Sequence, residues 1–396
     1  MHGAFKNFLK VGIVTSGTVG ITLFSLSEYQ KNAKMTQQLE IRRINPPILD
    51  EEHISRKVIC YRPSRRGLPN LSVERIADKI VTHNYGHGGS GWTLAPSSAI
   101  YVVDLLEKFA PELQKDTPIT VIGAGVLGLF TAYTLLGAKY KNITVVAEDF
   151  EDLTSHKAGG LLSPVYGGNP EWEKLITTLG LSSYLFYKDV AENKVSGFEG
   201  GASIMPAYFP NTKESELDLY VEHKVMKPPK DVILDFGNGT QRKMIAYDDG
   251  IFIHTMRLMT HLRNQLEKKV TFVKKKINAF EDIKDKYIIN CTGLGAKELN
   301  NDPNMVSIQG HLLLLKDQNS SDMQYMIAQD LEKTKNKHGQ DILRLFYIFP
   351  KINLSASDRD VGVLGGTFVT GATKDTPNTE EFEIMLKNAR EFYGIR

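Results

Sequence analysis

The chain has 396 residues, of which 41% are hydrophobic and 24% are charged, and its formal net charge at pH 7 is +2. This length allows two lobes with separate cores, and the composition is typical of a soluble globular protein. A charge balance so close to neutral gives no reason to expect a nucleic-acid partner. The two cysteines cannot supply a disulfide framework, and we predict no metal site.

Residues 1–30 differ from the rest of the chain. Within them, the 17 residues 11–27 carry no charge and follow two lysines, which is typical of a signal peptide or a short membrane anchor. Glycine, serine and threonine dilute this stretch, so a surface or disordered leader is the alternative interpretation. Membrane association through residues 8–27, export and a cytoplasmic location all stay open, as does the oligomeric state. Residues 31–57 are polar and contain Pro46-Pro47, which indicates a linker.

Two strands, a glycine-rich loop and a helix are predicted in the next part of the chain. The strands cover residues 58–62 and 79–85, with a turn that contains proline and glycine between them. The loop, residues 86–91, leads into an amphipathic helix over residues 96–108, with Ser97 and Ser98 available to cap it. The glycines of the loop leave backbone amides unobstructed, which favours contact with developing negative charge.

A dinucleotide-binding fingerprint follows this helix. A compact buried strand, residues 119–122, leads into Gly123-x-Gly125-x-x-Gly128, and a helix is predicted over residues 126–136. The glycines allow a tight turn, backbone approach to a pyrophosphate, and close packing of helix on strand. The next strand, residues 143–147, is followed by Glu148, which lies 25 residues after Gly123 and can accept hydrogen bonds from ribose hydroxyls.

The second half of the chain mixes helical and alternating patterns. Helices are expected over residues 171–191 and 254–268, and strands over residues 232–236, 270–273, 287–293, 343–350 and 361–368.

Motifs in five parts of the chain resemble the D-amino-acid oxidase family, which includes D-aspartate oxidase. They are Tyr61-Arg62-Pro63, the loop from His83 to Gly91, the glycine fingerprint, Asn290-Cys291-Thr292-Gly293, and Phe346-Tyr347-Ile348-Phe349-Pro350. In that family the Arg-Pro strand and the glycine loop come last, whereas here they precede the fingerprint. The resemblance therefore implies a circular permutation, which termini that lie close together make tolerable. A mis-assembled or tandem gene is the alternative.

The resemblance implies a fold of the α/β class, more closely described as an α+β flavoprotein of two lobes. One lobe would be Rossmann-like and bind FAD, and the other would bind the substrate with a mixed sheet. The segments of both lobes would follow one another in circularly permuted order. Residues 58–110 would be the family's closing segment, and residues 118–168 the FAD-binding βαβ unit. The substrate lobe would consist of residues 169–265 and 306–396, and between them residues 266–305 would return to the FAD lobe.

A permuted order makes a spatial prediction. Residues 58–62 should lie beside the strands that contain Tyr347 and residues 361–368, and residues 79–85 should reach the cofactor lobe near residues 119–122. By the same resemblance, Gln309-Gly310-His311 would form a turn at the lobe boundary.

The resemblance also assigns site residues. Arg62 would hold a substrate carboxylate through two parallel hydrogen bonds, Tyr347 would add another, and the carbonyl of Gly89 would accept one from the substrate amine. His83 and His87 are expected to be structural rather than catalytic. The residues expected to bind FAD are Gly123, Ala124, Gly125, Val126, Leu127, Gly128, Glu148, Thr154, Ser155, Gly159, Gly160, Leu161, Thr292, Gly88, Ser90, Gly91, Trp92 and Thr93.

The implied activity is the oxidation of D-amino acids to 2-oxo acids and ammonia, with hydride transfer to flavin N5 and reduction of oxygen to hydrogen peroxide. A flavin dehydrogenase that uses a quinone or carrier, and a non-catalytic flavin- or amino-acid-binding module, are the alternatives. The substrate side chain stays open. Leu343 stands where some members have a lid tyrosine, and Arg65, Arg66, Arg344 or His311 could meet a second carboxylate.

Overall fold

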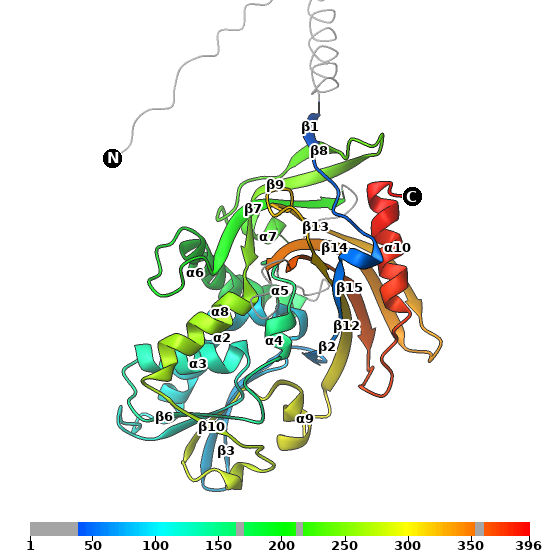
Figure 1. Cartoon of the computed structure of the whole chain (residues 1–396). Coiled ribbons are helices and arrows are strands. Elements are labelled where there is room, and N and C mark those ends of the chain that lie inside the picture. The colour runs from blue at the N-terminus through cyan, green and yellow to red at the C-terminus, as the bar shows by residue number, and fades with distance from the viewer. Residues whose placement is uncertain (1–38, 164–169, 211–216, 353–359) are drawn as a thin grey trace, which may run out of the picture. The chain divides into compact units, whose positions relative to one another are not determined.

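The computed structural model describes residues 39–163, 170–210, 217–352 and 360–396 (Figure 1). The chain divides into two units, residues 1–41 and 42–396, and the second unit contains both sheets and all helices described below. The segment for which a leader or anchor is predicted lies outside the described residues. Within the described part of the chain, no helix combines the length and the apolar character needed to cross a membrane.

The smaller of two sheets contains the strand of the glycine fingerprint. Its six strands, in spatial order, are β10 (Thr271–Lys274), β6 (Ile143–Ala147), β5 (Ile119–Ile122), β11 (Tyr287–Asn290), β4 (Lys79–Tyr85) and β3 (Asn70–Ile76). Neighbouring strands from β10 to β4 run parallel, and β3 runs antiparallel along the edge of β4. Every residue of β4, β5 and β11 is buried, as expected for parallel strands that are covered on both faces.

The larger sheet contains nine strands. In spatial order they are β1 (Glu40–Arg43), β8 (Lys230–Asp235), β9 (Gln241–Ile253), β7 (Ala202–Pro210), β13 (Met326–Lys335), β14 (Asp341–Ile352), β15 (Asp360–Thr370), β12 (Met305–Lys316) and β2 (Ile54–Arg65). The pairs from β13 to β2 are antiparallel, and β13 runs parallel to β7. Strand β1 crosses the boundary between the two units, so only Arg42 and Arg43 belong to the second.

Helices cover parts of both sheets (Figure 1). α2 (Gly91–Phe109) and α3 (Val126–Gly137) pack against each other and the smaller sheet, α8 (Thr255–Glu267) packs on α3, and α10 (Glu381–Tyr393) packs on β12, β14 and β15. The other described helices are α4 (Thr154–Lys157), α5 (Pro170–Leu175), α6 (Leu181–Ala191), α7 (Asp218–Glu222) and α9 (Ala296–Leu299). A π-helical turn over Ile176–Gly180 joins α5 to α6, so the helical prediction for residues 171–191 is confirmed.

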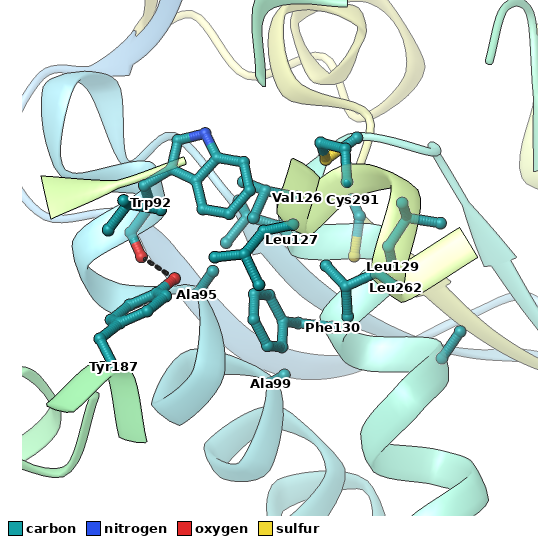
Figure 2. Packing of buried hydrophobic residues seen from close by; sticks show 14 of the residues in the cluster. Trp92, Ala95, Ala99, Val126, Leu127, Leu129, Phe130, Tyr187, Leu262 and Cys291 are labelled. Carbon is teal, nitrogen blue, oxygen red and sulfur yellow. Dashed lines mark hydrogen bonds between the residues drawn. The ribbon is translucent and has the colours of Figure 1, made fainter. Parts of the chain in front are cut away.

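The contact between α2 and α3 lies in the main hydrophobic core (Figure 2). Ala95 and Ala99 lie one turn apart on α2, and their small side chains leave room for Leu127 and Phe130 of α3. Cys291 belongs to the same core, where burial raises the pKa of its thiol to about 12. It is therefore a packed, protonated thiol.

The structure corrects the predicted start of α2. The helix begins at Gly91, not at Pro96, so Ser97 and Ser98 are buried inside it and do not cap it. Proline has no N–H to donate to the carbonyl four residues earlier, which is that of Trp92. The hydroxyl of Tyr187 donates to this carbonyl instead, at 2.7 Å (Figure 2). A donor from another helix thus lets α2 continue through a proline.

The spatial prediction made from the permuted order holds in outline and fails in one detail. Strand β2 joins the sheet that contains Tyr347, and β4 is separated from β5 by β11 alone. However, the backbone of β2 pairs with neither β14 nor β15, because β12 lies between β2 and β15. Gln309-Gly310-His311 is therefore part of a strand and is not a turn.

A further strand, β3, was not predicted. The sequence between residues 62 and 79 was expected to form a turn, yet Asn70–Ile76 pairs with β4 along its whole length. The strand lies at the sheet edge and exposes Ser72, Glu74 and Arg75. An edge strand of this kind needs few apolar residues, which is why its pattern is weak.

We predict that Tyr187→Phe lowers the free energy of unfolding of the apo-protein by about 1–3 kcal/mol, because the buried Trp92 carbonyl loses its donor. In a Pro96→Ala background the restored N–H can donate to the same carbonyl, so the same substitution should cost less than about 1 kcal/mol. Denaturant unfolding of the four proteins in this cycle measures both costs. Equal costs in the two backgrounds would contradict this explanation of the helix start.

Candidate active site

A cavity of about 670 Å³ lies at the carboxyl ends of the parallel strands of the smaller sheet and extends to β2 and β14. This end of an open parallel sheet is where ligands commonly bind in α/β folds. The segments after β4, β5, β6, β10 and β11 all contribute to its wall. From the larger sheet come Cys60, Tyr61, Arg62, Pro63, Leu312 and Tyr347.

The fingerprint glycines are required by close packing at one end of this cavity. Gly123 has a φ of +108°, and a Cβ atom there would lie 2.4 Å from the carbonyl oxygen of Cys291. A Cβ atom on Gly128 would lie 1.9 Å from the carbonyl oxygen of Gly123. The absence of a side chain at both glycines lets β5, β11 and the first turn of α3 pack closely, and the turn at the amino end of α3 lines the cavity.

The amino end of α3 is suited to a negatively charged group. Its first turn contains no acidic residue, and its backbone N–H groups carry the positive end of the helix dipole. One of them, that of Val126, donates to Ser155 Oγ at 3.0 Å. Beyond this point, Glu148 lines the cavity and is largely exposed, so its carboxylate is accessible to a ribose.

One wall of the cavity is formed by residues 153–159, here called the cradle segment. All of them except His156 line the cavity. The Thr154 hydroxyl donates to the carbonyl of Tyr61 in β2 at 3.1 Å, and the Trp92 indole N–H in α2 donates to the carbonyl of Ser155 at 2.9 Å. The cradle segment is thus fixed to three elements that also contribute to the cavity: β2, α2 and α3.

The glycine loop closes the cavity on the side of β4. His87 is 2% exposed, and burial lowers its pKa to about 3, so its ring is neutral at physiological pH. Its Nε2 lies 3.0 Å from Ser98 Oγ, while its buried Nδ1 has no hydrogen-bond partner among the described residues. Gly88 and Gly89 also line the cavity, and Gly89 is exposed to it.

His83 does not line this cavity. Its Nε2 lies 2.9 Å from Glu74 Oε1 and its Nδ1 lies 3.3 Å from Asn290 Nδ2. An amide nitrogen can only donate, so Nδ1 accepts and Nε2 carries the hydrogen that is donated to Glu74. Both ring nitrogens are therefore engaged in holding β3, β4 and β11 together, which agrees with a structural role for this residue.

Arg62 and Tyr347 meet at the opposite end of the cavity, although they are distant in sequence. The Arg62 guanidinium donates to the carbonyl of Thr367 at 2.9 Å and lies 4.0 Å from the centre of the Phe368 ring. Among the described residues, no carboxylate forms an ion pair with Arg62. Burial raises the pKa of Tyr347 to about 12, although a hydrogen bond from Arg62 and its positive charge act in the opposite direction. The Tyr347 hydroxyl is therefore protonated beside an arginine without a carboxylate partner.

Glycines make room for both side chains. A Cβ atom on Gly310 of β12 would lie 2.5 Å from Arg62 Nη1, and one on Gly365 of β15 would lie 2.1 Å from Tyr347 Cζ. Gly310, which the sequence placed in a turn, and Gly365 thus provide the space for the two polar side chains of this end.

Most of the predicted site residues share this one cavity. Those that line it are Arg62, Tyr347, Gly88, Gly89, Gly91, Trp92, Gly123, Ala124, Gly125, Val126, Leu127, Glu148, Thr154, Ser155, Gly159 and Thr292. The predicted residues that do not line it are Ser90, Thr93, Gly128, Gly160 and Leu161.

The residues outside the lining support it from behind. Gly128 packs on the Gly123 turn, and Gly160 accepts a backbone hydrogen bond from Ile253 at 2.7 Å. Thr93 donates to the carbonyl of Ser163 at 2.9 Å. Sequence reasoning missed the segments 275–278 and 293–299, whose lining residues follow β10 and β11. Their position after two parallel strands was the signal that could have identified them.

Three of the four side chains considered for a second substrate carboxylate have other partners. Arg65 pairs with Asp302 at 2.8 Å, and Arg344 binds both carboxylate oxygens of buried Glu381 at 2.7 Å each. His311 donates from Nε2 to the carbonyl of Pro377 at 2.8 Å. The fourth, Arg66, is exposed at the end of β2. None of these four residues lines the cavity.

Comparison with known proteins agrees with this geometry. The family model described as FAD dependent oxidoreductase matches residues 118–395. A D-amino-acid oxidase of Dictyostelium discoideum is 25% identical over 278 residues, which cover 68% of this chain and 71% of that protein. A human D-aspartate oxidase is 23% identical over 214 residues, which cover 49% of this chain and 58% of that protein. The chain therefore belongs to the family of FAD-dependent oxidoreductases of the amino-acid oxidase type.

Among solved structures, glycine oxidase from Bacillus cereus matches with a TM-score of 0.46 and 13% identity, over 69% of this chain and 79% of that one. Glycine oxidase from Geobacillus kaustophilus matches with a TM-score of 0.45 and 14% identity, over 65% of this chain and 72% of that one.

The residues of the cavity fit FAD. The glycine turn at the amino end of α3 would hold the diphosphate, and Glu148 would accept from the adenosine ribose. The cradle segment and the glycine loop would flank the flavin, where the unpartnered Nδ1 of His87 supplies a buried polar atom. Arg62 and Tyr347 lie beyond these residues, where a substrate can meet the flavin.

We predict that Gly128→Ala weakens FAD binding by about tenfold to a hundredfold, because the added methyl group would overlap the Gly123 carbonyl and displace the turn. Gly137→Ala is the matched control, since it lies in the same helix and a Cβ atom there meets no atom within 4 Å. This control should leave FAD affinity unchanged and alter stability by at most about 1 kcal/mol. Titration of the three apo-proteins with FAD measures the affinities, and equal values would show that this turn does not bind the cofactor.

Proposed function

We propose that the protein oxidises D-amino acids to 2-oxo acids and ammonia, with oxygen as the electron acceptor. The observation that carries this proposal is the Arg62–Tyr347 pair at the far end of the FAD cavity. An arginine that has no carboxylate partner of its own and lies beside a protonated tyrosine hydroxyl is suited to a substrate carboxylate.

The side chains of this end fix the substrate. Arg62 binds the α-carboxylate, and the Tyr347 hydroxyl donates a further hydrogen bond to it. The carbonyl of Gly89, an exposed residue of the cavity lining, accepts from the substrate amine, so carboxylate and amine are held at two points and the α-hydrogen is directed into the cavity. His87, whose ring stays neutral, adds a polar atom without adding charge.

When bound, FAD supplies the acceptor for the hydride that leaves the substrate Cα, and oxygen is reduced to hydrogen peroxide in the overall reaction. The chain contributes position and charge. The substrate loses two electrons and two protons to become an imino acid, which water converts to a 2-oxo acid and ammonia. This chemistry needs no acid–base side chain at Cα, which is consistent with the absence of a charged histidine or a lysine beside Arg62 and Tyr347 among the described lining residues.

We further propose that the preferred side chain is neutral. The described lining near Arg62 is supplied by Cys60, Pro63, Leu312 and Tyr347, none of which is charged. Arg65, Arg344 and His311 are each engaged elsewhere, which leaves them unsuited to a second substrate carboxylate. An acidic side chain at this end would lose its hydration without gaining a cation.

A panel of D-alanine, D-proline, D-aspartate and the L-enantiomers of all three tests both parts of the proposal. The purified flavoprotein should bleach anaerobically with neutral D-amino acids, and one hydrogen peroxide should form per substrate consumed in air. A yellow protein that remains oxidised with the entire panel would contradict amino-acid oxidation. Faster reaction with D-aspartate than with D-alanine would contradict the neutral side chain alone.

We predict that Arg62→Ala lowers kcat/KM by about a hundredfold or more, because charge-assisted hydrogen bonds contribute about 1.5–3 kcal/mol each. FAD affinity should change little. Arg62→Lys should recover part of the loss, since a point charge cannot reproduce the two parallel hydrogen bonds. Arg66→Ala, one residue beyond the end of the same strand and outside the cavity, should retain full efficiency. Wild-type efficiency of Arg62→Ala on its best substrate would contradict the assignment of the carboxylate site.

We also propose that the chain is a circular permutation of the family fold. The family model begins at residue 118, while β2, β4 and α2 lie before it and are integral to both sheets and the cavity. The carboxyl end lies next to the segment that leads into β2, because Arg390 Nε donates to the carbonyl of Leu49 at 2.8 Å. Ile395 packs on a core that contains Ile44 and Leu49. A short connection could therefore join these two points.

A rearranged chain tests this proposal. Residues 118–396, joined through a short glycine–serine linker to residues 44–110, should fold and bind FAD with the affinity of the natural chain. Residues 118–396 alone should not bind FAD, because they lack α2, β4 and the arginine strand. Retention of FAD affinity by residues 118–396, or failure of the rearranged chain to fold, would contradict the proposed permutation.

A further inference from the structure

Lys351 is a buried lysine that the proposed reaction does not use. It lies near the end of β14 and is 6% exposed. Burial lowers the pKa of its ammonium group to about 7. It does not line the cavity, so it does not reach the substrate.

The ammonium group of Lys351 has an oxygen acceptor for each of its three N–H groups. It donates to the carbonyl of His156 at 2.8 Å, to that of Ala158 at 2.5 Å and to the hydroxyl of Thr255 at 3.2 Å. The Thr255 hydroxyl lies 3.3 Å and 3.4 Å from the same two carbonyl oxygens and can donate to them. Lys351 thus supplies the shorter hydrogen bonds to two carbonyl groups whose other donor among the described residues is the Thr255 hydroxyl.

The two carbonyl groups belong to the cradle segment at the end of the short helix α4. The last carbonyls of a helical turn lack intrahelical donors, and a lysine can supply one while it also complements the helix dipole. Here the lysine belongs to β14, a strand of the larger sheet. It therefore fixes the main chain at the point where α4 ends and the flavin-facing residues Ala158 and Gly159 begin.

Lys351 acts together with two residues of the same strand. Tyr347, Phe349 and Lys351 of β14 all lie toward the cradle segment, because both rings are close to Gly159 and the ammonium group donates to Ala158. The rings of Tyr347 and Phe349 are stacked at 4.7 Å, and the Phe349 ring lies 2.9 Å from the position of a Cβ atom on Gly159. One strand thus binds the substrate carboxylate through Tyr347 and supports the cradle segment through Phe349 and Lys351.

We propose that Lys351 is a positioning residue for FAD, which holds the cradle segment in the conformation that binds the flavin. The other fixed points of the segment, at Thr154 and Ser155, lie at its beginning. Lys351 holds its second half, which is otherwise supported by the Phe349 ring. Loss of its three hydrogen bonds would leave both carbonyl oxygens with Thr255 alone and would let this half move away from the cofactor.

Lys351→Met tests the proposal, because methionine preserves the unbranched apolar stem and removes the donors. FAD binding is measured by titrating apo-protein at pH 6, where the natural lysine is charged, and following the quenching of flavin fluorescence. We expect FAD affinity to fall by about tenfold to a hundredfold. The KM for the amino acid at saturating FAD should change less than twofold, since Arg62 and Tyr347 keep their contacts.

Lys79→Met is the matched control. Lys79 is also a buried lysine that donates to a backbone carbonyl, that of Lys284 at 3.3 Å, but it lies on β4 outside the cavity lining. Its replacement should leave FAD affinity unchanged. If Lys351 is purely structural, its replacement should lower the melting temperatures of the apo- and holo-protein equally. If Lys351 positions FAD, its replacement should reduce the rise in melting temperature that FAD binding causes.

Thr255→Val provides a second variant in case Lys351→Met does not fold. This substitution removes the hydroxyl that accepts from Lys351 and donates weakly to the two carbonyl groups, while the side chain keeps its shape. FAD affinity should therefore also fall, but by a smaller factor than in Lys351→Met. Wild-type FAD affinity in Lys351→Met overturns the proposal. If that variant does not fold, wild-type FAD affinity in Thr255→Val overturns it.

Discussion

The pairing of β2 with β12 is the constraint on which the site depends. It runs from Arg65 opposite Met305 to Arg56 opposite Leu314, and it places Arg62 opposite Ile308, two residues from Gly310 on the same strand. Only because residue 310 has no side chain can the guanidinium turn toward Thr367, which lies 305 residues away in sequence. A shift of this register by one residue would move Arg62 to the other face of the sheet. The carboxylate end of the cavity would then have no cation.

The same sheet serves two purposes through one strand. Strand β14 places Tyr347 in the cavity lining, and Phe349 and Lys351 against the main chain of the cradle segment. Side chains of one strand therefore border both the cavity and the segment that forms one of its walls. Sites built on strands are held more precisely than sites built on loops.

Local sequence predicted the elements whose evidence is local. Strands β4, β5 and β6 have the predicted bounds, because short buried runs between glycine-rich turns leave few alternatives. The fingerprint and the loop at His87 were likewise recognisable from residue type and spacing, and both border the cavity. Arg62 and Tyr347 were identified by resemblance, and they share that cavity.

The remaining differences arise from contacts that a linear sequence does not display. Pro96 indicates a helix start when it is considered alone, and only the hydroxyl of Tyr187 allows the helix to begin five residues earlier. Gly310 suggests a turn, yet its role is to leave space for a side chain of another strand. Arg65 pairs with Asp302, which is distant in sequence, and Arg344 pairs with Glu381 in another element. Sequence spacing therefore could not show that both arginines already have a carboxylate partner. Lys351 gave no signal, because two of its acceptors are backbone carbonyls and the third is the hydroxyl of Thr255, 96 residues away in sequence.

The order of the strands also affects how the chain can fold during synthesis. Strands β2 and β4 leave the ribosome early, but their partners β12 and β11 come much later, and Tyr61 contacts Gln309 across 248 residues. At a synthesis rate of about 5–20 residues per second, this separation corresponds to roughly ten to fifty seconds. During that time β3 can cover one edge of β4 as a local hairpin, while the other edge stays unpaired. The nascent protein therefore presents an open strand edge for most of its synthesis, which makes early chaperone contact valuable for this chain.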